Sequence, residues 1–173
     1  MVLIGDKELS IQKAKKKDAQ EIIDYCNKVG GESDYLSFGA NEFPFTLQQE
    51  EESIEKLKGS SAEMFIGRID NKIVSIGSIR VSDKKRFSHH CEIGISVLKE
   101  FWGLGIGKHI MSTIINYARC DSPLEMLYLY VRADNTRAIE LYKNLGFAQT
   151  GYYTNHIKLN GEYFDEISMG LVL

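Results

Sequence analysis

The chain has few of the features that mark secreted, membrane-spanning or nucleic-acid-binding proteins. Its three cysteines, Cys26, Cys91 and Cys120, are widely spaced and form no Cys-x-x-Cys pair, so neither a disulfide framework nor a zinc site is expected. No apolar run approaches the roughly 18 residues that a transmembrane helix needs. The apolar start, residues 1–5, is too short for a signal peptide. These absences predict a cytoplasmic protein with free thiols and no membrane partner.

The chain also lacks an excess of positive charge. Its formal net charge is −3, and its only dense basic runs, residues 13–17 and 84–86, are short. A nucleic acid is therefore not expected as the main partner. The 173 residues are 43% hydrophobic and 26% charged, which is typical of one soluble globular domain with a substantial core. We expect a single domain over residues 1–173.

The most informative stretch is a glycine-rich segment between two apolar runs. Residues 93–97 before it alternate like a strand, and residues 110–118 after it have helical spacing. Glycines let the backbone turn sharply and point several N–H groups one way, and the following helix adds its positive dipole end. This combination predicts a site for a phosphate or pyrophosphate. The predicted binding residues are Gly103, Leu104, Gly105, Ile106, Gly107 and Lys108, the last of which is equally compatible with an exposed helix position.

Two nucleotide motifs do not fit this segment. A P-loop requires glycine at the position of Trp102 and serine or threonine at that of His109. The dinucleotide fingerprint would place its third glycine at Lys108, and Glu125 is only a loosely placed acidic residue. A nucleotide-dependent kinase therefore remains only as a rival hypothesis.

Hydrophobic periodicity and turn signals predict an α/β protein with a mixed sheet, in the order β-α-α-β-β-β-α-β-α-β-β. The seven expected strands are residues 9–14, 64–69, 73–81, 89–97, 126–131, 149–157 and 162–171. The four expected helices are capped by Asp18, by Thr46, by the glycine segment, and by Asn135 or Asp134. A helical crossover between residues 89–97 and 126–131 makes these two strands parallel neighbours.

Two motifs in this framework resemble those of the GNAT superfamily of acyl-CoA N-acyltransferases. The first is similar to Arg/Gln-x-x-Gly-x-Gly/Ala, with Gly105 and Gly107 on its glycines. Trp102 stands where the family has arginine or glutamine, which removes a polar side chain and leaves the backbone N–H groups. The second, residues 135–147, resembles Asn-x-x-Ala-x-x-x-Tyr-x-x-x-Gly-Phe. Both motifs occur in the family's order and spacing, and the likeness covers most of the chain.

The resemblance implies a GNAT fold, in which the two parallel strands splay apart and hold acetyl-CoA between them. The backbone of Ile95, Ser96 and Val97 would pair with the amides of the extended pantetheine arm. Asn135 would contact the same arm while it caps its helix. Tyr142, which is the usual thiolate acid of the family, would protonate the departing sulfur.

Acyl transfer to an alkyl amine also needs a base, because the ammonium pKa is roughly 10. Glu92 is the candidate, since it lies on the strand that enters the glycine segment and shares the parity of Gly94 and Ser96. Burial without a partner would raise its pKa toward a useful value. His89 and His90 are rival bases, and some family members use a water instead. Adjacent residues on a strand face opposite ways, so the two histidines predict no metal site.

We therefore expect a cytoplasmic acetyl-CoA-dependent N-acetyltransferase that uses no metal and acts by direct attack of a primary amine. The acceptor stays open between a polyamine, a protein N-terminus and a small amine, because the last hairpin is only loosely similar to that of spermidine and ribosomal-protein N-terminal acetyltransferases. Glu32, Asp34, Glu42 and the run 50–52 would suit a cationic amine, although acidic residues also favour helix starts. A catalytically inactive CoA-binding sensor or regulatory module is the alternative, and both monomer and homodimer remain open.

Overall fold

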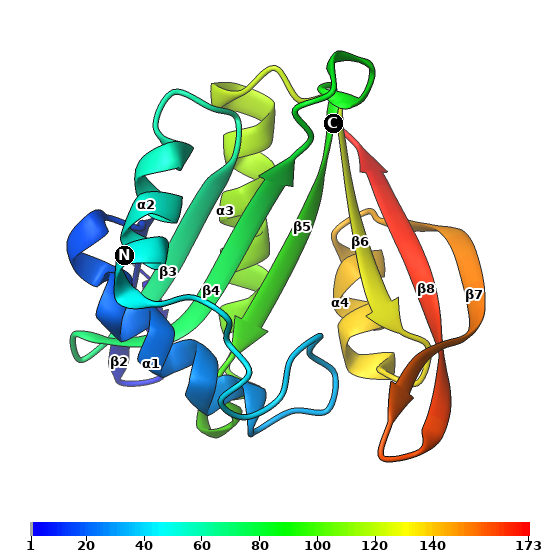
Figure 1. The fold of residues 1–173 in the computed structure, drawn as a ribbon, viewed down its shortest axis with the longest axis horizontal. Coiled ribbons are helices and arrows are strands. Elements are labelled where there is room, and N and C mark those ends of the chain that lie inside the picture. Colours follow the sequence, from blue (N-terminus) through cyan, green and yellow to red (C-terminus); the bar gives the residue numbers. More distant parts are fainter. Residues whose placement is uncertain (1) are drawn as a thin grey trace.

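The computed structural model describes residues 2–173 and shows one mixed β-sheet with helices on both faces (Figure 1). The strands lie in the order β1-β2-β3-β4-β5-β6-β8-β7. They are β1 Val2–Ile4, β2 Lys7–Lys13, β3 Glu63–Ile69, β4 Lys72–Val81, β5 His90–Val97, β6 Met126–Arg132, β7 Ala148–Leu159 and β8 Glu162–Val172. The α-helices are α1 Ala19–Gly30, α2 Leu47–Leu57, α3 Ile106–Asp121 and α4 Thr136–Asn144. Within residues 2–173, no helix has the length and apolar character needed to cross a membrane.

The predicted mixed α/β architecture is confirmed, with one strand more than expected. The added strand, β1, pairs antiparallel with β2 and is three residues long, too short to show an alternating pattern. Helix α3 begins at Ile106 rather than at Ile110, because Gly105 takes the left-handed conformation at its N-cap. At the C-terminal hairpin, Asn160 and Gly161 both have positive φ, as the predicted turn requires.

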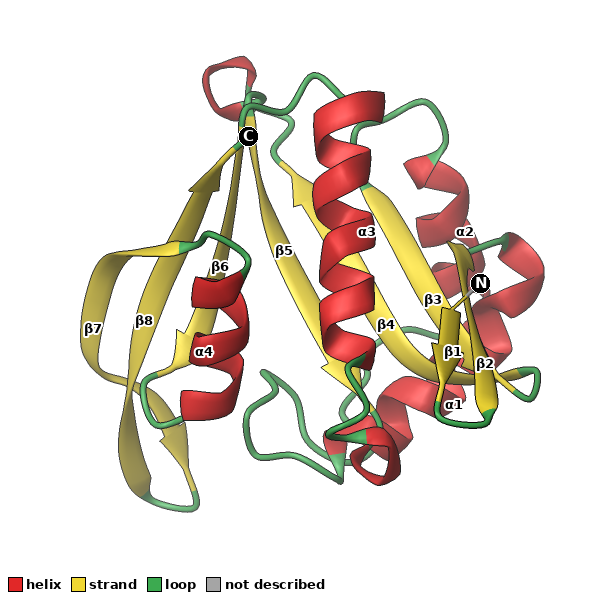
Figure 2. Ribbon diagram, turned by 180° about the vertical axis from the view of Figure 1, so that it is seen from behind, coloured by secondary structure: helices red, strands yellow, loops and turns green. Residues whose placement is uncertain are grey.

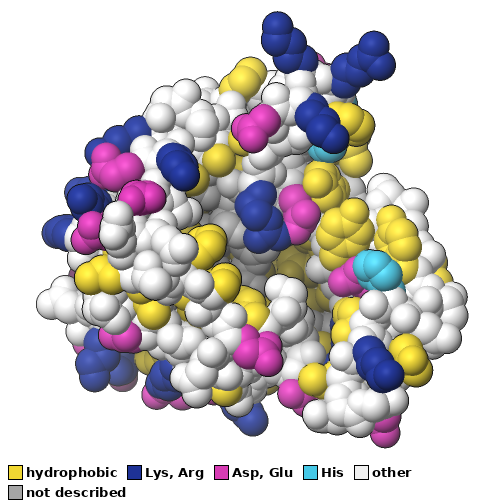
Figure 3. All heavy atoms as spheres, viewed as in Figure 1, with side chains coloured by type: hydrophobic (Ala, Val, Ile, Leu, Met, Phe, Trp, Pro, Cys, Tyr) yellow, Lys and Arg dark blue, Asp and Glu magenta, His cyan; other side chains and the backbone are white. Residues whose placement is uncertain are grey.

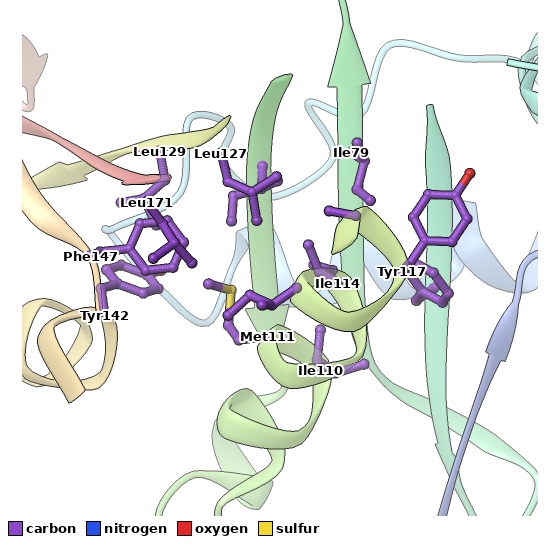
Figure 4. Close-up of a cluster of buried hydrophobic side chains, with 14 of the residues drawn as sticks. Ile79, Ile110, Met111, Ile114, Tyr117, Leu127, Leu129, Tyr142, Phe147 and Leu171 are labelled. Carbon is purple, nitrogen blue, oxygen red and sulfur yellow. The ribbon is translucent and has the colours of Figure 1, made fainter. Parts of the chain in front are cut away.

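The helices divide between the two faces of the sheet: α3 and α4 cover one face, and α1 and α2 cover part of the other (Figures 1 and 2). Helix α3 packs through a stripe of apolar residues, each at most 1% exposed: Ile106, Ile110, Met111 and Ile114 (Figure 4). A Cβ on Gly77 of β4 would lie 2.5 Å from Ile110 Cγ2, so glycine at this position lets the helix approach the sheet. This packing fixes the glycine segment at the end of β5.

Strands β5 and β6 run parallel but pair over three residues only, His90 with Met126, Cys91 with Leu127 and Glu92 with Tyr128. Beyond this point β5 continues along β4 as far as Val97, and β6 continues along β8. The facing edges of β5 and β6 therefore separate, as the widening gap in Figure 1 shows. The predicted splay is confirmed.

Candidate active site

The glycine segment presents a row of unpaired backbone N–H groups. Gly103 and Gly105 have φ of 87° and 79°, in the left-handed region that favours glycine. Within residues 2–173, the N–H groups of residues 103–108 have no hydrogen-bond acceptor. They lie at the N-terminus of the 16-residue helix α3, whose dipole favours negative charge. A Cβ on Gly103 or Gly105 would meet nothing within 4 Å, so the segment is open. This arrangement fits a phosphate group.

Trp102, the departure from the first motif, attaches the glycine segment to β5. Its indole Nε1 donates a hydrogen bond to the carbonyl oxygen of Val97 at 2.7 Å. The Arg137 guanidinium lies 5.5 Å from the centre of the same indole, which brings a positive charge from α4 beside the segment. One of the backbone acceptors expected to meet pantetheine, the Val97 carbonyl, is therefore already engaged.

The residues expected to contact pantetheine lie on the free edge of β5. Ile95, Ser96 and Val97 come after the last pair with β6, and they pair with β4 on the other side only. Ser96 Oγ is hydrogen bonded to Tyr25 Oη of α1 at 3.0 Å. Burial raises the pKa of Tyr25, so its hydroxyl stays neutral and holds α1 against β5. Sequence reasoning missed this contact, because helical spacing alone gives Tyr25 only a core position.

Helix α4 supplies Asn135 and Tyr142 on the other side of the gap. Asn135 Oδ1 accepts a hydrogen bond from the Ala138 N–H at 3.2 Å, which confirms its predicted role as N-cap. Tyr142 is 8% exposed and packs with Phe147 against Leu129 and Leu171 (Figure 4). Burial raises the pKa of Tyr142 to about 12, and its hydroxyl has no hydrogen-bond partner among residues 2–173. The hydroxyl thus keeps its proton at neutral pH.

Glu92 lies at the point where β5 and β6 begin to separate, on the face opposite α3. The Glu92 side chain is neither fully buried nor without a partner. Its carboxylate forms an ion pair with Arg80, the residue directly opposite on β4, and the Glu92 side chain is 30% exposed. Cross-strand neighbours of opposite charge meet in this way because their Cβ atoms lie about 5 Å apart.

The two histidines lie at the closed end of the gap. His89 is exposed, whereas His90 Nδ1 is buried and has no hydrogen-bond partner. The His90 ring contacts Tyr128, with 5.3 Å between ring centres. Among the described residues, no three His, Cys, Asp or Glu side chains are grouped as a metal site.

A continuous set of aromatic rings, here termed the aromatic row, begins at His90 and extends away from α1. Neighbouring ring centres are 5.2 to 6.0 Å apart, from His90 through Tyr128, Tyr130 and Tyr153 to His156. Tyr130 is 43% and Tyr153 is 39% exposed. Figure 3 shows hydrophobic side chains and a histidine gathered beside a hollow on this face. The sequence gives only a partial signal, the alternation of Tyr128 and Tyr130, because the rings come from three strands.

Most acidic residues expected on the acceptor side are engaged within the chain. Glu32 accepts a hydrogen bond from the Lys99 N–H at 2.7 Å, and Glu42 accepts one from the Gly39 N–H at 2.7 Å. Glu50 is an exception, because it is 1% exposed, its Oε1 has no hydrogen-bond partner among residues 2–173, and burial raises its pKa. Arg132, at the end of β6, donates to the backbone carbonyl oxygen of Asp34. The carboxylates of Glu32 and Glu42, together with Arg132, therefore position the loop before α2.

Comparisons with known proteins agree with this geometry. L-amino acid N-acetyltransferase AaaT of Escherichia coli is 31% identical over 112 residues, which are 64% of this chain and 68% of that protein. Spermidine N(1)-acetyltransferase of Vibrio cholerae is 26% identical over 90 residues, and the match spans about half of each chain, 52%.

Solved structures resemble the whole chain. The acetyltransferase of the GNAT family from Streptococcus pneumoniae is 27% identical, with a TM-score of 0.93 over 96% of this chain and 100% of that one. YncA of Salmonella typhimurium, solved with its cofactor acetyl-CoA, is 18% identical and has the same fold, with a TM-score of 0.84 over 96% of this chain and 94% of that one. The family model described as Acetyltransferase (GNAT) family matches residues 32–147. The chain therefore belongs to the acetyltransferase (GNAT) family.

Proposed function

We propose that the chain, as a single domain over residues 1–173, transfers the acetyl group of acetyl-CoA to a primary amine. The observation that carries this proposal is the separation of β5 from β6 directly after Glu92 and Tyr128, next to the unpaired N–H groups of residues 103–108. A free strand edge and an anion site at one end of it suit an extended ligand with amides and a pyrophosphate.

The cofactor contacts follow from these two features. The N–H groups of residues 103–108, from Gly103 to Lys108, would hold the pyrophosphate, and Arg137 adds positive charge beside them. The backbone groups of Ile95 to Val97, apart from the Val97 carbonyl that Trp102 engages, and the amide nitrogen of Asn135 would pair with pantetheine. Acetyl-CoA supplies an activated acyl group, whose carbonyl carbon accepts the nucleophile.

The chemical step needs three proton transfers. The ammonium of the acceptor loses one proton to Glu92, directly or through a water, and the amine nitrogen then bonds to the acetyl carbonyl carbon. The carbon–sulfur bond breaks, the sulfur takes the Tyr142 hydroxyl proton, and the nitrogen loses its second proton to solvent, which leaves the neutral amide. Solvent then returns a proton to Tyr142 and removes one from Glu92. The pKa of about 12 for Tyr142 keeps this proton available at neutral pH.

The acceptor is a polyamine, a protein N-terminus or another small amine. The named activities of the relatives fall into these classes, since they include spermidine, L-amino acid and N-alpha acetylation. We also propose a cytoplasmic location, from the three free thiols.

An amine panel offered with acetyl-CoA tests the activity, with thiol release as the readout. The panel contains spermidine, a peptide with a free N-terminus and single amino acids. Release of CoA with one of these acceptors, and an acetylated product by mass spectrometry, is the expected result. Binding of CoA without release for any acceptor would instead favour the inactive sensor. Binding of ATP in competition with CoA would favour the kinase.

A further inference from the structure

We propose that the acceptor is a free α-amino acid with an apolar or aromatic side chain, held as a zwitterion by Arg80 and Glu92. This inference rests on the proposed acetyl transfer and names the substrate class of the same site. It follows from the charges and rings that lie where β5 and β6 separate.

Arg80, Glu92 and Tyr128 form one line across three neighbouring strands. Arg80 of β4 lies directly opposite Glu92 of β5, and Glu92 lies directly opposite Tyr128 of β6. All three side chains are on the face that α3 and α4 leave free. In Figure 3 a basic and an acidic side chain lie side by side in the hollow at the centre of this face.

Each member of the Arg80–Glu92 pair has hydrogen-bonding capacity to spare. Within residues 2–173, Arg80 donates to Glu92 Oε1 through Nη2, whereas Arg80 Nε and Nη1 and Glu92 Oε2 have no partner. The Arg80 side chain is 62% exposed. A guanidinium has five N–H donors, so Arg80 can keep Glu92 and still bind a carboxylate through its other edge.

An α-amino acid presents the complementary pair of charges on one carbon. Its carboxylate would bind Arg80 while its ammonium approaches Glu92, the residue proposed to take the proton. Both ends of the acceptor would then be satisfied without removing the ion pair between the two side chains. The zwitterion is thus oriented with its nitrogen at the point where the strands separate.

The aromatic row gives the side chain of this acceptor a surface to pack on. Tyr128 follows Glu92 in the line across the sheet, and Tyr130 lies two residues further along β6. The half-exposed rings of Tyr130 and Tyr153 leave apolar area open beside the charged pair. Apolar groups, and aromatic rings above all, gain most from such a surface.

The same features disfavour the other two acceptor classes. A polyamine has no carboxylate, so Arg80 would place a positive charge beside its ammonium groups. A peptide N-terminus likewise has no carboxylate next to its amine, because the amide bond has replaced it. The observations therefore favour the free amino acid.

Matched pairs of acceptors that differ only in the carboxylate test the inference. The probes are L-phenylalanine with 2-phenylethylamine and L-leucine with 3-methylbutylamine, each assayed for thiol release with acetyl-CoA. We expect kcat/KM to be about 10- to 100-fold higher for the amino acid of each pair, since a charge-assisted hydrogen bond contributes on this scale. Arg80→Gln should abolish this preference, because it should lower kcat/KM for the amino acid about 10- to 100-fold more than for the matching amine.

Binding measurements separate the substrate contact from catalysis. In protein saturated with CoA, titration with L-phenylalanine should give a Kd about 10- to 100-fold weaker for Arg80→Gln than for wild type. Arg119→Gln is the matched control, because Arg119 is exposed on α3, on the other side of the sheet. It should leave both the Kd and the carboxylate preference unchanged.

A second pair of variants tests the aromatic row. Tyr130→Leu should lower kcat/KM for L-phenylalanine about two- to tenfold more than for L-leucine, because it removes a ring from the side-chain surface. Tyr163→Leu is its control, since Tyr163 is 58% exposed and does not belong to the aromatic row. It should have no effect on either substrate.

Four outcomes would overturn the inference. Equal turnover of both members of each pair would show that Arg80 does not bind the acceptor carboxylate. An Arg80→Gln variant that keeps the carboxylate preference would show the same. Turnover of spermidine or a peptide N-terminus with none of the amino acids would overturn the substrate class while the acetyl transfer stands. No turnover of any amine would overturn both.

Discussion

Glu92 of β5 lies directly opposite Tyr128 of β6, and this is the last pair that the two strands make. One residue further, the strands follow different neighbours and their facing edges are free. The proposed base is thus located where a ligand can enter between the strands. The position of Glu92 follows from this strand pairing, and its charge is stabilised by Arg80 on the other side.

Gly105→Val tests the anion site. Valine would be strained at a φ of +79°, at a cost of about 1–2 kcal/mol in stability, but its Cβ would meet no atom within 4 Å. The fold should therefore persist while the affinity for CoA, measured by calorimetry, falls at least about tenfold, since a phosphate site with one or more blocked N–H groups loses charge-assisted hydrogen bonds.

Gly59→Val is the matched control for this variant. Gly59 has a φ of +77°, and a Cβ there also meets nothing within 4 Å, so the backbone strain is the same. It should lower stability similarly and leave the affinity for CoA unchanged. Equal CoA affinity in Gly105→Val and Gly59→Val would remove the argument for a phosphate at residues 103–108.

Glu92→Gln tests the base. The variant keeps the shape of the side chain but cannot take a proton, so turnover should fall by about a hundredfold to ten-thousandfold, with CoA affinity unchanged. The acid-side decline of the wild-type rate should also flatten. Stability should change by less than about 1 kcal/mol, because the ion pair with Arg80 is partly exposed. A wild-type pH profile in this variant would point to a water or to His89 or His90 as base.

Tyr142→Phe tests the acid. It keeps the ring packed against Phe147 and removes a hydroxyl that has no partner among residues 2–173, so the cost in stability should be small. Thiol release should fall by about a hundredfold to ten-thousandfold while acetyl-CoA still binds. Tyr117→Phe is the control. Tyr117 is also 8% exposed in the same core, but it lies on α3 and packs against Phe65 of β3. Equal turnover in the two variants would make Tyr142 a core residue only.

The buried thiols predict how stability depends on pH. Burial raises the pKa of Cys26 and of Cys91 to about 12, whereas a thiol in the unfolded chain has a pKa of about 8.5. Because the folded pKa is the higher one, the stabilisation is complete below pH about 8.5 and is lost as the pH rises toward 12. Each thiol contributes a fall of up to about 1.4 kcal/mol per pH unit.

Urea unfolding between pH 8 and 10 measures this fall. In Cys91→Ala the slope of the unfolding free energy against pH should be smaller than in wild type by the contribution of one thiol. Cys120→Ala should keep the wild-type slope, because Cys120 is exposed. A wild-type slope in Cys91→Ala would mean that the thiol is ionised to the same extent in both states.

Local sequence patterns determined most elements and those candidate site residues that belong to one segment. The glycines between an alternating and a helical run fixed a strand, a turn and a helix N-terminus, because positive φ is accessible mainly to glycine. Asn135 and Thr46 were recognisable as helix caps, and both accept the expected backbone hydrogen bond. Each of these features depends on residues that are close together in the sequence, and so each can be predicted from the sequence.

Only the tertiary structure decided which side chains from different strands meet. The register of β4 with β5 brought Arg80 opposite Glu92, so that the two side chains form an ion pair. The order of β6, β8 and β7 assembled Tyr130 and Tyr153 into the aromatic row, although 22 residues separate them in the sequence. Strand register depends on packing summed over the whole sheet, and shifting it by one residue would reverse every side chain, so no single segment encodes these contacts.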